Sequence, residues 1–314
     1  MSGPLMQFSV GEVTLTKIVE QAAVPRVAEE MITGFGPAEV HGYLKSSAPE
    51  TVDLASESIY IGFHSWLLQA PGWTALIDPA VGNGKRRPTI SYLDGWQTDY
   101  LDHLAQAGIA PSDVDVVIST HHHVDHVGWN TQREGDAWVP TFPNARYIWN
   151  RTEFDYFHER HLAGENVNHG SHVDSILPIV DAGLAEIVDV DSADRHDVLP
   201  GLTIGSAAGH TPGTIVAYLE DSQAGAVFVG DCLHHPGQVG CGHLGNHADA
   251  DPSAASRARG RLLEECARTG MLLVPGHFTG PGCGYVRPTA NGLIYESARP
   301  LAPSPSLTTT EENV

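Results

Sequence analysis

Short apolar runs recur along the chain, each ended by glycine, proline or a polar turn. Runs of four to eight residues bounded in this way are typical of β-strands. The alternation of apolar and polar positions over residues 6–20 has the same meaning, because successive side chains of a strand point to opposite faces. The pattern therefore predicts strands at residues 6–20, 59–63, 66–69, 74–77, 114–118, 145–149, 184–190, 202–207, 214–219, 226–229 and 272–274.

Three segments have helical spacing instead. Residues 99–107 and 152–161 form two of them, and residues 254–268 form the third. The third segment has clear boundaries, because Asp251-Pro252 is a capping residue followed by a first-turn proline, and Gly270 ends it. Strands alternating with helices indicate an α/β fold.

The composition supports a globular chain that does not bind nucleic acid. The 314 residues permit one large domain or two small ones, and 41% hydrophobic residues suffice for a core. The formal net charge is −21. Binding to phosphate backbones requires a basic face, so this charge argues against a nucleic-acid partner.

The cysteines and the N-terminus indicate a cytoplasmic location. The four cysteines show no CxxC pair, so we expect free thiols in a reducing compartment. The N-terminus lacks the basic and apolar regions of a signal peptide, and no 18-residue apolar run predicts a membrane span.

The segment 119–128 carries the most informative motif, Ser-Thr-His-His-His-Val-Asp-His-Val-Gly. It directly follows the strand predicted at 114–118. Alternate residues of an extended loop point to one side, so His121 and His123 converge on one metal ion, and His122 points away. Asp125 and His126 then face a neighbouring position. Imidazole and carboxylate groups at this spacing are typical of a divalent metal site.

Three further ligand-type residues follow later strands: His210, Asp231 and His277. Loops that leave a sheet commonly carry functional residues. The predicted ligand set is therefore His121, His123, Asp125, His126, His210, Asp231 and His277. Seven ligands suffice for two ions, one held by three histidines and one by aspartate and histidine, with Asp231 bridging them. Zn²⁺ is favoured, although Mn²⁺, Fe²⁺ and Co²⁺ also accept mixed nitrogen and oxygen ligands.

From this motif order, the chain resembles the metallo-β-lactamase-fold hydrolase superfamily over residues 58–296. The long gap between His126 and His210, and the stretch Ala208–Gly213, resemble the branch of N-acyl-homoserine lactonases and methyl-parathion-hydrolase-like enzymes. The resemblance implies an αββα sandwich with a dinuclear site at one edge. It also implies that Asp78 supports the metal loop.

We therefore predict three regions. Residues 1–57 form an N-terminal strand and an arm packed on the main domain, 58–298 form the catalytic domain, and 299–314 form a disordered tail. In related enzymes such an arm borders the active site or a dimer partner, so a homodimer is possible.

The mechanism predicted from the site is metal-assisted hydrolysis of a small-molecule substrate. A hydroxide bridging the two ions attacks a lactone or ester carbonyl. Asp231 bridges the ions and Asp125 relays a proton to the leaving group. No G-x-S-x-G sequence suggests a serine nucleophile. The alternatives are a phosphotriester hydrolase, a glyoxalase II-like thioester hydrolase and, in a different class, a diiron redox protein.

Four residues are candidates for the substrate pocket. Trp129 and Phe278 would supply apolar walls, and His234 or His235 would donate to a substrate carbonyl. No basic segment that would bind an anionic glutathione moiety is evident, which favours lactones and aryl esters over thioesters. The histidines at 158, 161, 169 and 172, and the group Cys241, His243 and His247, are expected not to bind metal.

Overall fold

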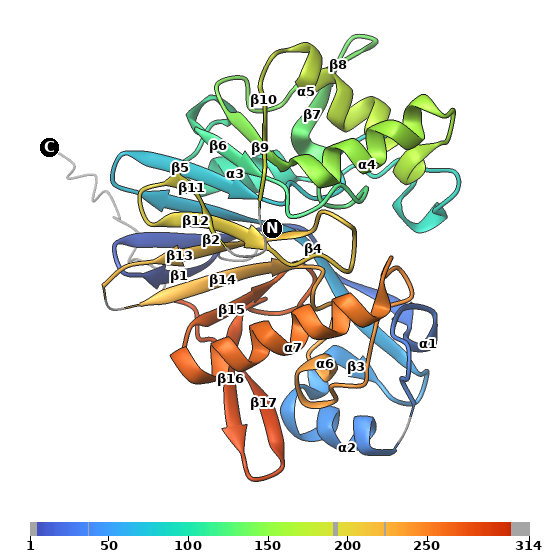
Figure 1. The fold of residues 1–314 in the computed structure, drawn as a ribbon, viewed down its shortest axis with the longest axis vertical. Helices are drawn as coiled ribbons and strands as arrows, with labels where there is room; N and C mark the ends of the chain where they lie inside the picture. The colour runs from blue at the N-terminus through green and yellow to red at the C-terminus, as the bar shows by residue number, and fades with distance from the viewer. Residues whose placement is uncertain (1–4, 37, 191–193, 223, 303–314) are drawn as a thin grey trace, which may run out of the picture.

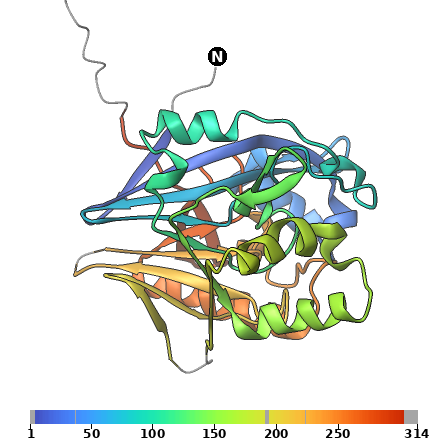
Figure 2. The same ribbon diagram turned by 90° about the horizontal axis from the view of Figure 1, so that it is seen from above.

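The computed structural model describes residues 5–36, 38–190, 194–222 and 224–302. Two β-sheets lie face to face with helices on their outer sides (Figures 1 and 2), which is the αββα sandwich expected from the sequence. The first sheet has the order β1-β2-β4-β5-β6-β9-β10, with β3 paired to β4. The second runs β11-β12-β13-β14-β15-β16-β17, and β7-β8 form a separate hairpin.

The strands of the first sheet are β1 (Met6–Val10), β2 (Val13–Val27), β3 (Val52–Asp53), β4 (Ser58–Ala70), β5 (Trp73–Ile77), β6 (Val116–Ile118), β9 (Arg146–Asn150) and β10 (Ala185–Val188). Those of the second are β11 (His196–Leu199), β12 (Leu202–Ser206), β13 (Ile215–Glu220), β14 (Gly225–Gly230), β15 (Leu272–Pro275), β16 (Gly284–Thr289) and β17 (Gly292–Ser297). The hairpin pairs β7 (Thr131–Glu134) with β8 (Ala137–Pro140).

The helices are α1 (Ala28–Met31), α2 (Ala38–Ser47), α3 (Tyr100–Gln106), α4 (Arg151–Leu162), α5 (Leu177–Asp181), α6 (Gly237–Gly240) and α7 (Pro252–Thr269). A π-helical turn, η6, spans His172–Ile176. The predicted limits of α7 are confirmed. The Asp251 side chain accepts a hydrogen bond from the Ala254 amide at 2.9 Å, and Gly270 ends the helix with φ 75°.

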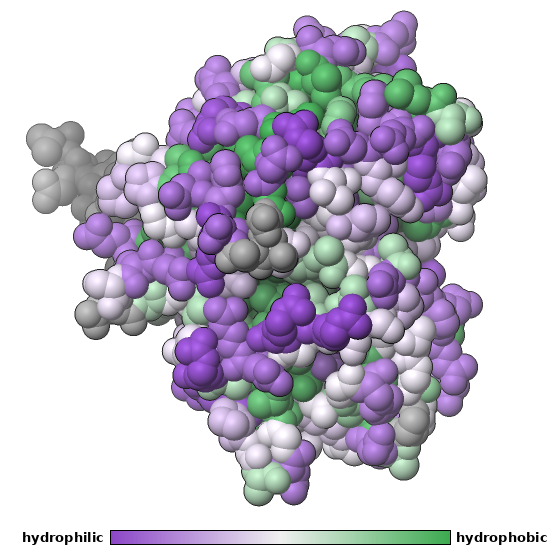
Figure 3. Space-filling model, in the orientation of Figure 1, coloured by the Kyte–Doolittle hydropathy of each residue, from purple (hydrophilic) through white to green (hydrophobic). Residues whose placement is uncertain are grey.

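Period-two burial in the strands builds the core. In β5, Ala75 and Ile77 contribute to the layer between the sheets, whereas Leu76 faces outward with Tyr100 and Leu104 of α3. The outer face of the second sheet is covered by α7 in the same way. The outer surface seen in Figure 3 is mainly hydrophilic, with apolar residues scattered among the polar ones.

Two strand predictions need correction. The run at residues 6–20 is divided into β1 and β2 by a turn at Gly11, which has φ 56°. The runs at 59–63 and 66–69 join into the single strand β4, because its central residues are buried and no turn interrupts them. The short strands β7, β8, β11, β16 and β17 were not predicted, since partly exposed hairpins lack a continuous apolar run.

The N-terminal segment belongs to the sandwich through β1 and β2, which pair with each other and with β4. Beyond β2, the segment folds into α1 and α2. Ile32, directly after α1, and Leu44 of α2 share a buried apolar cluster with Ile61 and Val124. This places the segment beside the loop that carries the metal motif. Most of the tail predicted to be disordered, residues 303–314, lies outside the described residues.

The four cysteines are buried free thiols, as expected. None of the described helices has the length and apolar character needed to span a membrane.

Candidate metal centre

The metal-motif loop leaves the end of β6 and is held by Asp78, at the end of β5. The Asp78 carboxylate accepts hydrogen bonds from the Thr120 amide at 2.7 Å and its hydroxyl at 2.8 Å. One of its oxygens lies 3.0 Å from His126 Nδ1. At the other end of the loop, Gly128 packs directly against the backbone of Val81. Any larger residue would clash there, because its Cβ would lie 1.8 Å from the Val81 carbonyl oxygen. The loop is therefore fixed at both ends.

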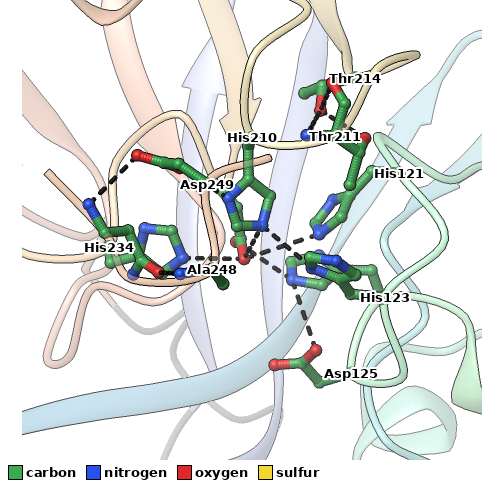
Figure 4. Close-up of polar contacts among 12 residues, drawn as sticks. His121, His123, Asp125, His210, Thr211, Thr214, His234, Ala248 and Asp249 are labelled. Carbon is green, nitrogen blue, oxygen red and sulfur yellow. Dashed lines mark hydrogen bonds and ion pairs between the residues drawn. The ribbon is translucent and has the colours of Figure 1, made fainter. Parts of the chain in front are cut away.

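The first group of ligand-type side chains contains His121, His123, His210 and Asp231. Figure 4 shows the three histidines of this group turned toward one another. His210 Nε2 lies 3.0 Å from His123 Nδ1 and 3.3 Å from Asp231 Oδ2. His121 Nε2 lies 3.6 Å from the same carboxylate oxygen. His121 and His123 come from the loop after β6 of the first sheet. His210 and Asp231 come from the loops after β12 and β14 of the second sheet.

The second group contains Asp125, His126 and His277. His126 Nε2 and His277 Nε2 lie 3.2 Å apart, and each is 3.1 Å from Asp231 Oδ1. Asp125 Oδ2 is 3.5 Å from His277 Nε2. Asp231 therefore faces the first group with one oxygen and the second group with the other.

Outer hydrogen bonds orient the imidazoles. His210 Nδ1 lies 2.9 Å from Asp249 Oδ1, and His277 Nδ1 lies 2.9 Å from the Gly62 carbonyl oxygen. Because those oxygens accept a proton from Nδ1, Nε2 is left to direct its lone pair toward the centre. A partner that fixes the tautomer in this way is typical of metal-binding histidines.

The electrostatics show that this centre requires positive charge. Burial lowers the pKa of His126, but the carboxylates of Asp231 and Asp78 outweigh it and raise that pKa well above its usual value. Burial would raise the pKa of Asp231, yet His126, His234 and His277 lower it far below its usual range. A buried carboxylate is thus kept charged, which requires compensating protons or cations.

The donor set fits divalent ions. His121 Nε2 is buried without a hydrogen-bond partner, although it points at the centre. Burial and the neighbouring histidines His126 and His123 lower the pKa of His121 well below its usual value, so this ring stays neutral. Burial likewise lowers the pKa of His123 well below its usual value. Two neutral imidazoles beside the Asp231 carboxylate are a suitable environment for a zinc-like ion.

The structure places the remaining histidine of the motif away from this centre. The His122 ring is buried at 5.0 Å from the Trp149 ring, and burial lowers its pKa to about 3. This is the packing role expected from the alternation of the loop.

The substrate candidates divide into one residue on the cavity and three away from it. His234 lines the cavity, and its Nε2 lies 3.0 Å from Asp231 Oδ2. His235 is turned away, with Nε2 3.0 Å from the Thr51 carbonyl oxygen. Trp129 is a core residue, stacked on Tyr100 and bonded to Glu20. The pocket role predicted for Trp129 is therefore corrected.

Phe278 needs the same correction. It is buried behind His277, and its ring packs against Tyr295 in the core of the second sheet. Large apolar side chains are more often buried in the core than exposed at a binding site. The position of Trp129 and Phe278 next to metal ligands in the sequence did not show which of these two roles each residue has.

The other histidine-rich segments do not form a group with metal-binding geometry among the described residues. His158 Nδ1 lies 3.2 Å from His172 Nε2, but no third ligand converges on the pair. His169 is separate from them and lines the central cavity.

The cavity beside the two groups has a volume of about 200 Å³. Beyond the ligand-type residues, its wall is mostly apolar with a few neutral polar side chains. Its lining comprises Met31, Ile61, Ile90, Tyr92, His123, Val124, Asp125, Asn168, His169, His210, Asp231, His234, Asn246, Ala248 and His277. Among these described residues there is no lysine or arginine.

Sequence reasoning missed two acidic residues that position the loops. Asp249 orients His210, as described above. Glu153 of α4 accepts hydrogen bonds from the His122 amide at 2.8 Å and the Thr211 hydroxyl at 2.7 Å, which connects the two ligand-bearing loops. Neither has a distinctive local sequence signal, because each acts on residues far away in the chain.

The comparison with protein families agrees with this geometry. The profile of the Metallo-beta-lactamase superfamily matches residues 64–277, which is more than half of the chain. The chain belongs to this superfamily. The match starts in β4 and ends at the last predicted ligand, His277.

Relatives with assigned activities are distant. N-acyl homoserine lactonase AiiA of Bacillus thuringiensis subsp. kurstaki is 28% identical over 127 residues, 40% of this chain and 41% of that protein. The chain thus matches only about two fifths of this relative. AiiB of Agrobacterium fabrum, also an N-acyl homoserine lactonase, is 25% identical over 203 residues, 59% of this chain and 68% of that protein.

Solved structures share the fold. A hydrolase of the beta-lactamase superfamily, AbOPH, has a TM-score of 0.77 at 20% identity, covering 95% of this chain and 99% of its own. The dizinc quorum-quenching lactonase AidC has a TM-score of 0.73 at 19% identity, covering 95% and 98%.

Proposed function

We propose that this protein is a dinuclear metal-dependent hydrolase that opens a lactone or cleaves an ester. The observation that carries the proposal is the position of Asp231 between the two imidazole groups, with one oxygen 3.3 Å from His210 and the other 3.1 Å from His126. A single carboxylate shared in this way is the arrangement needed to bridge two ions. The dizinc lactonase AidC shares the fold, which favours zinc as the resident metal.

Two divalent ions at these groups would lower the pKa of a water molecule to near 7 and so supply a nucleophile at neutral pH. His121, His123 and His210 would hold one ion, and Asp125, His126 and His277 the other. Asp125 lies at the cavity wall and its side chain is 16% exposed, so it also reaches the space where a leaving group would lie. We assign it the role of moving a proton to that group.

The cavity favours an uncharged substrate. Six of its lining residues are apolar: Met31, Ile61, Ile90, Tyr92, Val124 and Ala248. An anionic substrate would need a lysine or arginine partner, and the described lining contains neither. The lactonase activity assigned to AiiA and AiiB is compatible with this environment. A cytoplasmic location and a homodimer stay predictions.

A substrate panel tests the proposal. The zinc-loaded protein should hydrolyse a hydrophobic lactone or aryl ester at least tenfold better in kcat/KM than S-lactoylglutathione. A tenfold ratio corresponds to about 1.4 kcal/mol in transition-state binding. A phosphotriester belongs in the same panel. A preference for the thioester would instead support a glyoxalase II-like enzyme.

A further inference from the structure

A lysine side chain, that of Lys17 on β2, is buried between the two sheets. Lys17 is 2% exposed, and it lies on the same inward face of β2 as Leu15, two residues earlier. Burial lowers the pKa of its amine to about 7, although Cys283 opposes this change. Removing an amino group from water is costly, so we expect contacts around it that compensate the cost.

The amine is bound by the loop that joins β15 to β16, residues 276–283. Lys17 Nζ donates to the carbonyl oxygens of Phe278 and Gly280, both at 2.9 Å. No other group in the described part of the chain donates to either oxygen. The loop passes so close to the amine that a Cβ at Gly282 would lie 2.6 Å from Nζ. Both the charged and the neutral amine have enough N–H groups for these two carbonyls, so the contact does not require one protonation state.

The same loop carries His277, a member of the second ligand group, near its start. The Gly62 amide of β4 donates to the His277 carbonyl oxygen at 2.8 Å, and the Gly62 carbonyl oxygen lies 2.9 Å from His277 Nδ1. Lys17 binds the next carbonyl along the chain, that of Phe278. Two neighbouring strands of the first sheet, β2 and β4, therefore hold the start of a loop that belongs to the second sheet.

The histidines of the first ligand group do not depend on this lysine. His121 and His123 follow β6 and His210 follows β12, so none of them belongs to the loop that Lys17 binds. His210 is oriented instead by Asp249, as described above. Loss of the lysine contacts would therefore act mainly on one of the two groups.

We propose that Lys17 is a positioning residue that holds the His277 loop in the geometry needed by the second metal ion. The inference rests on the dinuclear centre of the proposed function. Ligands that are held in place before binding lose less conformational freedom when the ion arrives, so they bind it more tightly. Lys17 thus raises the affinity of the second group for its ion and leaves the affinity of the first group nearly unchanged.

Zinc titration of the metal-free protein, followed by calorimetry, tests the proposal. The wild-type protein should bind two ions, and His277→Ala identifies the binding event that belongs to the second group. In Lys17→Met, which keeps the apolar part of the side chain, the dissociation constant of that event should rise at least tenfold. A tenfold rise corresponds to about 1.4 kcal/mol. The dissociation constant of the other event should stay within about threefold.

Cadmium NMR gives a second readout that does not depend on activity. Cadmium in each group should give its own resonance in the wild-type protein. The resonance that is lost in His277→Ala should shift or broaden in Lys17→Met, whereas the other should not move. A purely structural role of Lys17 would give a different result, because a weakened sandwich would lower the Tm of the metal-free protein and weaken both groups together.

Two further variants complete the test. Lys45→Met removes an exposed lysine of α2 and should leave both binding events unchanged. Lys17→Gln keeps an N–H donor on a shorter, uncharged side chain, so it should give an intermediate dissociation constant for the second group. This variant decides the question if Lys17→Met does not fold.

Equal weakening of both binding events in the Lys17 variants, or no change in either, would overturn the inference and leave the proposed function standing. Weakening of the first group alone would do the same. A wild-type protein that binds a single ion would instead overturn the dinuclear centre, and the inference with it.

Discussion

The side chain of Asp231 is the point at which the two halves of the metal centre meet. It is buried and lies within 3.3 Å of imidazole nitrogens of His126, His210, His234 and His277. A buried carboxylate of this kind is tolerated because several positive or partly positive groups surround it. Its removal therefore affects every ligand in the centre.

Replacing Asp231 with alanine should lower kcat/KM by several orders of magnitude more than His122→Ala. The first change removes the carboxylate that two ions would share in the proposed centre, whereas the second removes a ring packed against Trp149. His122→Ala should instead destabilise the fold by a few kcal/mol, about 2–4, through the cavity that it leaves. Kinetics and metal content of both purified variants check this. Equal kinetic losses in two folded proteins would show that His122 belongs to the site.

Glu20 offers a residue-scale test of pH dependence. It accepts hydrogen bonds from the Val81 amide, the Gly82 amide and the Trp129 indole, and burial outweighs these bonds to raise its pKa to about 7. A carboxyl group with a raised folded pKa contributes full stability below its unfolded pKa. That contribution is lost as the pH rises through the folded value.

The stability of Glu20→Gln relative to wild type should therefore increase between pH 5 and pH 8.5, by at most about 3 kcal/mol. Urea unfolding at several pH values measures it. Glu12→Gln, which removes an exposed carboxylate in the turn after β1, is the matched control variant. A flat difference for Glu20→Gln would contradict the role of burial.

At the scale of elements, part of the cavity wall is formed by two segments that contain no long helix or strand. The loop after β5 supplies Ile90 and Tyr92, and the stretch before α5 supplies Asn168 and His169. A regular element would position such residues by its own hydrogen bonds. Here the buried side chain of Arg87 does so, because its guanidinium donates to the His169 carbonyl oxygen at 3.4 Å.

Arg87→Met should cost about 3–5 kcal/mol of stability. It leaves the buried Asp174 carboxylate, which lies 2.7 Å from the guanidinium, without its main partner. The adjacent Arg86 provides the comparison. Its side chain is 76% exposed and lies 3.0 Å from Asp94, so Arg86→Met should cost about 0–1 kcal/mol. Guanidinium unfolding curves of both variants test the difference. Similar losses would mean that Arg87 does not anchor the wall.

At the scale of the whole molecule, the metal centre connects the two sheets. His121 and His126 follow β6 of the first sheet, whereas Asp231 and His277 follow β14 and β15 of the second. Ions bound to both sets would hold the sandwich together at this edge. Binding energy that exists only in the folded state adds directly to stability.

The purified protein should hold close to two metal ions per chain, and their removal by a chelator should lower Tm. Saturation at about 1,000 times the dissociation constant contributes about 4 kcal/mol. Metal analysis together with calorimetry during stepwise zinc addition tests this. In Asp231→Ala most of the zinc-induced shift in Tm should disappear. Saturation at one ion, with no response to a second equivalent, would contradict a dinuclear centre.

The helices, the strands and the metal-ligand residues could be predicted from the sequence because their signals lie close together in the chain. Apolar runs such as 226–229 are followed at once by a polar ligand-type residue, here Asp231, and capping signals such as Asp251 and Gly270 delimit α7. These signals act within a few residues, so they survive without tertiary context. Trp129 and Phe278 lacked such a signal, since an aromatic side chain next to a motif packs equally well inward or outward.

The sequence by itself determined an α/β fold, the order of the ligand-type residues and the outward turn of His122, because periodicity and donor chemistry depend on residue type and spacing. The sandwich architecture was implied by the resemblance to metallo-β-lactamase-fold hydrolases. Only the tertiary structure decided which ring nitrogens face the centre and which residues form the cavity wall. Those features depend on contacts such as Asp249 with His210 and Arg87 with Asp174. Such contacts join residues distant in the chain, and their energies arise only when the segments are packed together.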